Sequence, residues 1–468
     1  MDTTVAKQNR FIMIGCYFLM FTLAAYGLSL ATIQQPMLDS MGGGAYFSLV
    51  TLISSIGMTI MTPVGGRLMD GLGSRKLTVY GGLISLAAGL VMAFIPNLWV
   101  FLIARVIFSM AQGATASVPY IVARQVNPPQ KLSTVFGMLA TIMSVGGFLG
   151  SWLAGILMQN GLMSLAVAFP CITLAIGTWI IWKYMDDTHN GAMHMDWLGF
   201  ILLSLCLASL LLSLNFGPKM GWFSLWIVLG FIVGVCALLA FIAWENKTAS
   251  PLIPMSIFKE KQYIMLLSIA FCTVFYIVAM NTYLPMAVQN VLQAGTGVSG
   301  SLQLPKTIVL VLVPTAFGIW VAKKPSNTWK ALAIACISVI VACGLLVFVG
   351  VKMPVWFIMI MVGITGIADA MRSVSLTPAA QRILKPQDLG IGTSLIGFTI
   401  TLSNTIAATV DGIAYDSLVR EVPGIVGVTH GIDTTFLLSA GVALVGLFLT
   451  ILFFRPMLEK RAAEKAAK

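Results

Sequence analysis

The chain has 468 residues, of which 58% are hydrophobic and 9% are charged, and its mean hydropathy is +0.95. A water-soluble protein of this length needs far more polar surface, so the composition excludes that class and indicates a polytopic membrane protein. The net charge of +11 does not indicate nucleic-acid binding, because the basic residues lie in short segments between apolar runs.

Fourteen apolar runs follow one another along the chain, and each is long enough to cross a bilayer as a helix. The runs cover residues 11–35, 46–66, 77–96, 98–121, 133–158, 162–184, 197–216, 222–244, 263–291, 299–322, 328–350, 354–380, 389–416 and 434–455. With the N-terminus inside, 21 Lys and Arg residues fall in inner segments and three in outer loops. This asymmetry sets membrane orientation, so we expect both termini in the cytoplasm.

The first polar segment between two runs is GGRLMDGLGSRK, residues 65–76, which we expect to form a loop. Its glycines permit a tight turn and a close backbone approach. Asp70 is suited to face a helix N-terminus, and Arg75 and Lys76 anchor the next span on the inner side. A basic turn that only sets topology would explain the cations, but not the acid and the glycines.

The spacing of these residues resembles the signature loop of the major facilitator superfamily. In that family the loop is a cytoplasmic latch that opens and re-forms as two halves of the protein rock. The resemblance therefore implies a gating latch, and not substrate ligands, at Gly66, Asp70, Gly73, Arg75 and Lys76. Two later segments, 250–263 and 281–292, resemble the fourteen-span branch of drug:proton antiporters, which also implies an inner or plasma membrane.

The fifth run carries small residues at Gly137, Gly146, Gly150 and Gly155. Gly146 and Gly150 form a GxxxG pair, which lets a neighbouring helix pack closely. The run is similar to the antiporter signature of drug:proton exchangers, although Ser151 stands where that signature has proline. Two interpretations remain open, helix packing alone and an antiport-specific role.

A faint internal repeat relates the first six runs to the last six. Pro129-Gln130-Lys131-Leu132 opens the fifth run, and Pro386-Gln387-Asp388-Leu389 opens the thirteenth, 257 positions later. Together with the resemblance, the repeat predicts an all-α polytopic membrane protein with the major facilitator fold and 14 transmembrane helices. We expect six-helix halves at 1–185 and 262–468 and an inserted helix pair at 186–261, with the substrate site between the halves.

Five charged residues lie well inside apolar runs, away from the run ends, where a charge is costly and is a functional candidate: Arg105, Lys306, Asp369, Arg372 and Asp411. Asp369 and Arg372 share a helix face, so they form either a structural ion pair or a site where Asp369 exchanges the coupling proton. Asp411 is the second proton-coupling candidate, unless water reaches it. Arg105 and Lys306 have no acid nearby in sequence; Asp411 is one possible partner, and unpaired cations would attract an anion.

The substrate site is expected among polar and aromatic residues of the central spans, namely Arg105, Gln112, Lys306, Arg372, Gln34, Tyr26 and Asn281. The first run lacks the acid that fourteen-span exporters usually carry, and cations exceed acids by one among the intramembrane charges. Both features favour an anionic substrate. All seven cysteines lie in apolar runs, and His189 and His194 share a loop with aspartates, so we expect no metal and no cofactor.

The leading prediction is a proton-coupled secondary transporter, and not an enzyme, that moves amphipathic or drug-like molecules by alternating access in the direction of efflux. The alternative is proton-coupled uptake or exchange of an organic anion, such as a carboxylate or a bile-acid-like metabolite. The expected partners are a small-molecule substrate, protons and the lipid bilayer, without nucleic acid, and the chain is expected to act as a monomer.

Overall fold

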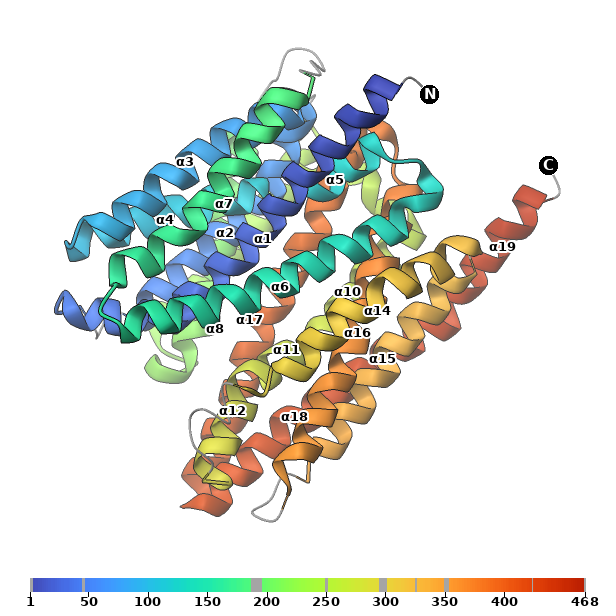
Figure 1. Ribbon diagram of the computed structural model, residues 1–468. Coiled ribbons are helices and arrows are strands. Elements are labelled where there is room, and N and C mark those ends of the chain that lie inside the picture. The colour runs from blue at the N-terminus through green and yellow to red at the C-terminus, as the bar shows by residue number, and fades with distance from the viewer. Residues whose placement is uncertain are drawn as a thin grey trace.

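The computed structural model describes residues 3–43, 47–186, 196–248, 251–293, 301–324, 326–348, 353–422 and 424–466. Within these residues the secondary structure is helical, without strands. The loop with His189 and His194 lies outside them. The helices form two bundles that lie side by side, one coloured blue to teal and the other yellow to red in Figure 1.

The first bundle is built from six long helices, of which the fourth is broken near residue 116. They are α1 (Thr3–Ser40), α2 (Phe47–Leu72), α3 (Ser74–Phe94), α4 (Leu98–Thr115) with α5 (Val118–Val126), α6 (Leu132–Gln159) and α7 (Met163–Tyr184). The predicted fourth run, 98–121, is therefore two helices. Pro119, one residue into α5, suits the start of a helix because it donates no backbone hydrogen bond.

Two helices follow as a hairpin, α8 (Trp197–Met220) and α9 (Leu225–Glu245). The second bundle contains α10 (Lys261–Val274), α11 (Tyr276–Val278), η4 (Ala279–Tyr283), α12 (Leu284–Met286), η5 (Ala287–Val291), α14 (Leu304–Lys323), α15 (Asn327–Leu346), α16 (Val355–Ile383), α17 (Leu389–Glu421), α18 (Ile425–Phe448), η7 (Leu449–Phe454) and α19 (Arg455–Ala466). The predicted ninth run is thus a succession of short helical segments that includes two π-helices, η4 and η5. π-Helical turns are frequent at functional sites.

Thirteen helices of the described residues are long and apolar enough to cross a membrane. Helix α2, the expected second span, is not among the thirteen, although it is one continuous helix of 26 residues. The expected loop over 65–76 is wrong for its first part, because α2 continues to Leu72 and carries Gly66 and Asp70. The turn itself is confined to Gly73, whose φ of 83° favours glycine.

The internal repeat has a structural counterpart. A short 3₁₀ helix, η2 (Pro129–Lys131), precedes α6, and another, η6 (Pro386–Asp388), precedes α17. The halves contact each other mainly through two helix pairs, α2 with α17 and α6 with α14. Under the repeat, the fifth span (α6) corresponds to the thirteenth (α17), and the second (α2) corresponds to the tenth (α14). The two helix pairs are therefore equivalent contacts.

Close packing inside the first half depends on the predicted GxxxG pair. A Cβ on Gly146 would lie 2.9 Å from Phe21 Cα, and one on Gly150 would lie 2.5 Å from Ala25 Cα. The two glycines therefore let the α6 backbone lie directly against α1. Gly155 takes no part in this contact, because no atom lies within 4 Å of a Cβ built there.

Candidate functional site

The two halves are joined at the end of the molecule that carries both termini (Figure 1). Asp70, near the end of α2, accepts backbone hydrogen bonds from Gly390 N at 3.0 Å and Ile391 N at 3.2 Å, in the first turn of α17. The partly positive N-terminus of a helix stabilises a carboxylate in this position. The predicted latch acid therefore faces a helix N-terminus of the other half.

Small residues bring the same two helices together. A Cβ on Gly66 would lie 2.7 Å from Gly390 O and Ile391 Cα, so a larger residue cannot fit between α2 and α17. The equivalent α14–α6 contact uses Gly318, whose Cβ would lie 2.7 Å from Ser133 O and from Thr134 Cα. Gly390 and Ile391 follow Ser133 and Thr134 by 257 positions, the offset of the sequence repeat.

Of the other predicted latch residues, Arg75 bonds within the first half. Arg75 donates from Nε to the carbonyl of Trp182 at 3.0 Å, which fixes the start of α3 against α7. Asp388 lies directly before α17; burial raises the pKa of its carboxyl, and Lys385 and Arg67 oppose that shift. Arg67 also acts on Asp70, so positive charge from α2 accompanies both acids at this end of α17.

Three further contacts between the halves escaped sequence analysis. The hydroxyls of Ser117 and Ser394 lie 2.7 Å apart, and Thr141 Oγ1 donates to Leu310 O at 2.8 Å. Gln381 Nε2 lies 3.4 Å from Tyr120 O. Isolated hydroxyl and amide side chains in apolar helices gave no signal, because such residues also bond within their own helix.

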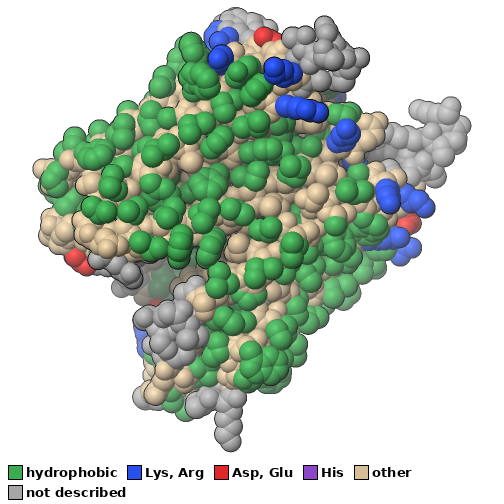
Figure 2. All heavy atoms as spheres, in the orientation of Figure 1, with side chains coloured by type: hydrophobic (Ala, Val, Ile, Leu, Met, Phe, Trp, Pro, Cys, Tyr) green, Lys and Arg blue, Asp and Glu red, His purple; other side chains and the backbone are tan. Residues whose placement is uncertain are grey.

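At the opposite end the two halves diverge (Figure 1), and the space-filling view shows the surface hollowed between them (Figure 2). On the face shown, Lys and Arg side chains gather at the end with the termini, whereas hydrophobic side chains cover the sides of the bundles (Figure 2). The structure is therefore closed at the terminal end and open at the other end.

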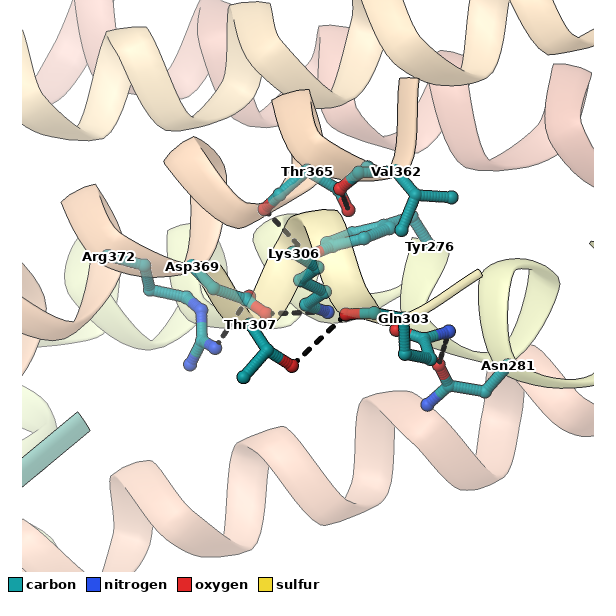
Figure 3. Close-up of polar contacts among 9 residues, drawn as sticks. All are labelled: Tyr276, Asn281, Gln303, Lys306, Thr307, Val362, Thr365, Asp369 and Arg372. Carbon is teal, nitrogen blue, oxygen red and sulfur yellow. Dashed lines mark hydrogen bonds and ion pairs between the residues drawn. The ribbon is translucent and has the colours of Figure 1, made fainter. Parts of the chain in front are cut away.

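A three-residue ion cluster lies in the second half (Figure 3). Lys306 Nζ is 2.8 Å from Asp369 Oδ2, and Arg372 Nη2 is 2.9 Å from Asp369 Oδ1. The three side chains are 12–17% exposed. Asp369 thus contacts Arg372, as the shared helix face predicted, and it also contacts Lys306, so the cluster carries one cation in excess.

The cluster is positioned by close contact between α14 and α16. A Cβ on Gly366 would lie 3.0 Å from Lys306 O and 2.9 Å from Val309 Cβ, so glycine lets α14 approach α16 there. Lys306 lies in the first turn of α14, nearer the helix start than the predicted run suggested. Its ammonium group also lies 5.5 Å from the centre of the Tyr276 ring, a cation–π distance (Figure 3).

Arg105 lies in the first half, on α4, and differs from the cluster because it has no ion pair with an acid in the part of the chain that the structure describes. Among the described residues, Nη1 makes one long hydrogen bond, 3.5 Å to Ser109 Oγ, and the buried Nε has no partner. Arg105 is therefore a cation inside the protein to which the described residues offer no compensating carboxylate.

Asp411, on α17, is completely buried. Neither of its carboxyl oxygens has a hydrogen-bond partner in the part of the chain that the structure describes. The suggested pairing of Asp411 with Arg105 or Lys306 is therefore wrong, and so is its exposure to water. Tyr283 and Tyr415 lie nearby, with ring centres 5.4 Å apart, and a Cβ on Gly412 would be 3.8 Å from Tyr283 Oη.

Comparison with known proteins agrees with this geometry. A sequence profile described as the Major Facilitator Superfamily matches residues 11–408. The chain belongs to the major facilitator superfamily.

Curated relatives of this transporter carry names of drug resistance. Multidrug resistance protein 3 of Bacillus subtilis is 23% identical over 88% of this chain and 81% of the relative. Multidrug transporter protein MdtP of the same organism is 24% identical over 87% of this chain and 75% of the relative. In fold, the transporter is similar to the human organic anion transporter MFSD10, with a TM-score of 0.65, 14% identity and coverage of 96% and 100% of the two chains.

The remaining predicted site residues of the transporter are distributed over both halves. Gln34 donates to Thr51 Oγ1 at 2.8 Å, and the buried Tyr26 hydroxyl lies 2.6 Å from Cys171 Sγ, so both bond within the first half. The exposed Asn281 accepts from Gln303 Nε2 at 3.2 Å, close to the ion cluster (Figure 3). Gln112 is partly exposed on α4, one turn beyond Ser109 and on the same helix as Arg105.

Sequence analysis did not identify Asp433 as an acid inside a span. Asp433, on α18, has a buried Oδ1 without a partner among the described residues. Sequence analysis began the last span at 434, whereas α18 begins at Ile425 and places Asp433 two turns inside the helix. The described residues contain no group of three or more His, Cys, Asp or Glu suited to a metal ion.

Proposed function

We propose that the protein is a proton-coupled secondary transporter that exports amphipathic, drug-like organic molecules and prefers those with a negative group. The observation that carries the substrate preference is the uncompensated guanidinium of Arg105. The excess cation of the Lys306–Asp369–Arg372 cluster adds to it on the other half.

A buried cation without a partner is costly, and an anion that enters its surroundings removes part of that cost. Each half of the protein thus offers a positive group, within helices that are predominantly apolar. A molecule with a hydrophobic body and one acidic group matches this combination. A lipophilic cation would instead meet repulsion from both halves.

For the coupling proton, the geometry favours Asp411 over Asp369. Asp369 is held between two cations, which stabilise its charged form. Asp411 is buried and its carboxyl oxygens have no hydrogen-bond partner among the described residues, so its ionised form is unfavourable; we propose that it carries a proton in this open-ended state. Rocking of the halves would change its surroundings and release the proton on the other side.

In the proposed cycle the junction of α2 with α17 is the cytoplasmic gate, so the present structure is outward-facing. The cation-rich terminal end supports this orientation in an inner or plasma membrane. The names of the bacterial relatives support export. The proposed partners are the small-molecule substrate, protons and lipid, and the proposed working unit is a monomer.

Uptake or exchange of an organic anion is the second candidate function. It is favoured by the same cations, and it needs no acid in the first span. The two candidates differ in the direction of proton movement relative to the substrate.

The test uses liposomes that contain the purified protein in one orientation and a trapped pH-sensitive dye. Two membrane-impermeant probes are added in turn, an aromatic sulfonate and an aromatic quaternary ammonium compound of similar size. We expect the sulfonate to drive the larger proton flux, in the direction opposite to its own movement. Proton movement together with the sulfonate would establish uptake in place of export.

Variants link the flux to the residue that carries the proposal. Arg105→Gln should reduce the sulfonate-driven flux at least tenfold, whereas Arg420→Gln, which removes an exposed cation, should leave it unchanged. A larger response to the ammonium probe that Arg105→Gln does not alter would overturn the substrate class. Substrate flux without proton flux would overturn the coupling.

A further inference from the structure

The base of the inserted hairpin contains a second arrangement of acids, distant in sequence from the transport residues. Asp196 directly precedes α8 and accepts a hydrogen bond from Gly199 N at 2.8 Å, as a helix cap. Trp244 Nε1, near the end of α9, lies 2.9 Å from each oxygen of the same carboxylate. Within the described residues, the donors to Asp196 come from the hairpin itself.

Glu245 follows Trp244 and ends α9. Its side chain is 3% exposed, and its Oε2 accepts the backbone N–H of Ile253 at 3.0 Å. Its other oxygen, Oε1, is buried and has no hydrogen-bond partner among the described residues. Glu245 therefore holds the linker that leads to the second half with one oxygen and leaves the other unused.

The unused oxygen lies near Asp196. A Cβ built on Gly199 would lie 2.6 Å from Glu245 Oε1 and 2.6 Å from Asp196 Oδ2, so the two oxygens lie beside the same point, within about 5 Å of each other. Two ionised carboxylates that converge in a buried site repel each other strongly. One of them must carry a proton or the pair would separate.

We infer that Asp196 and Glu245 form a proton-binding site in which the Glu245 carboxyl donates Oε1–H to the Asp196 carboxylate. Asp196 accepts from two N–H donors and lies at the N-terminus of α8, and both features stabilise a carboxylate as the acceptor. Glu245 lies at the C-terminus of α9, where the helix dipole opposes a negative charge. In the described part of the chain, the charged groups that act on Glu245 are Asp196 and Arg67 of α2.

With this proton, the two carboxyl groups link the start of α8, the end of α9 and the linker at 251–253. Leu252 and Ile253 of this linker are buried in an apolar cluster shared with α2, α10 and α17. Loss of the proton would place two negative charges at the point where the hairpin meets both halves. The site thus binds one proton to hold the hairpin in place, independently of the transport cycle.

Infrared spectroscopy of the intact protein in nanodiscs tests the proton directly, because a protonated carboxyl has its own C=O stretching band. At neutral pH, Glu245→Gln should remove one carboxyl from that band, whereas Glu260→Gln, at an exposed acid, should leave it unchanged. An unchanged band in Glu245→Gln would overturn the inference.

A second variant separates a shared proton from a glutamic acid that is merely buried. The amide introduced by Asp196→Asn can donate to Glu245 Oε1, which should allow Glu245 to ionise, so the band should again lose one carboxyl although Glu245 is intact. Retention of the full band in Asp196→Asn would show that Glu245 holds its proton without Asp196 and would overturn the shared site.

The pH dependence of unfolding gives a third readout, which also remains available if one variant is unstable. The folded chain binds one proton more than the unfolded chain, so the wild-type melting temperature should fall as pH rises through the release of this proton. Glu245→Gln keeps both hydrogen bonds and should flatten that fall. Glu245→Ala should melt lower at every pH; a profile for Glu245→Gln that parallels the wild type would contradict the site.

Discussion

Asp70 and Gly390 lie on different halves of the transporter, and Asp70 Oδ1 accepts the backbone N–H of Gly390 at 3.0 Å. The bond uses the free N–H groups that every helix has at its N-terminus. It needs no particular side chain on α17, so it can break and re-form as α2 moves. This is a suitable property for a gate.

Asp70→Asn should weaken the closed terminal end, because the amide keeps one acceptor oxygen but loses the charge that faces the helix dipole. The expected loss is about 1 kcal/mol, roughly a fivefold shift towards opening. Distances between spin labels at Gln130 and Lys385, both exposed at that end, measure the shift. Asp388→Asn removes a charge at the same helix end, where no hydrogen bond joins Asp388 to α2 within the described residues, and should shift the distances less. Equal shifts would remove the latch role.

Gly66→Ala and Gly318→Ala should each prevent closure of the terminal end, because the added methyl group would meet the backbone of the facing helix. Overpacking of this kind costs about 1–3 kcal/mol. Turnover in liposomes should fall accordingly, while the apparent affinity for the sulfonate at the open end is retained. Gly155→Ala, which meets no atom within 4 Å, is the matched control. Normal turnover in both closure variants would mean that these helices do not close the gate.

Sequence analysis found the features that depend on local spacing. The helical spans, the α6 glycine pair and the Asp369–Arg372 pair all follow from residues within a few turns of each other. The 257-residue offset of the repeat also relates the α17 residues that face Gly66, Gly390 and Ile391, to the residues that face Gly318, Ser133 and Thr134. These inferences need no knowledge of how each helix is rotated.

Features that depend on helix rotation were beyond sequence analysis. A membrane helix is apolar on all sides, so hydrophobic periodicity does not show which side faces the bundle. For this reason the partner of Lys306, the burial of Asp411 and the isolation of Arg105 became visible in the structure alone. The Asp196–Glu245 pair was missed because 48 residues separate its members and Asp196 was assigned to a loop.

Gly366→Ala should disturb the ion cluster without changing any of its charges. The methyl group would push α14 away from α16 and lengthen the contact between Lys306 and Asp369. We expect the KM for the sulfonate to rise roughly tenfold, in line with an overpacking cost of about 1–3 kcal/mol. Gly363→Ala is the control, because its Cβ would make an ordinary 3.5 Å contact with Pro305. Equal KM values for the two variants would place the cluster outside the substrate site.

Asp411→Asn should abolish proton coupling while the protein remains folded. Asparagine has nearly the shape of the protonated acid, so the proposed state of Asp411 is mimicked and stability should change by less than about 1.5 kcal/mol. Exchange of labelled sulfonate down its own gradient should continue, because the substrate cations are intact. Accumulation against a gradient driven by protons should be lost.

The control for this variant is Asp416→Asn, at an exposed acid just over one turn further along α17. It should keep both activities. Asp369→Asn should give the opposite pattern, because it leaves Lys306 and Arg372 without their shared carboxylate. Removing one partner of a buried ion pair costs about 3–5 kcal/mol. We therefore expect a loss of stability and not a specific loss of coupling. If Asp411→Asn still concentrates substrate and a stable Asp369→Asn does not, the coupling role passes to Asp369.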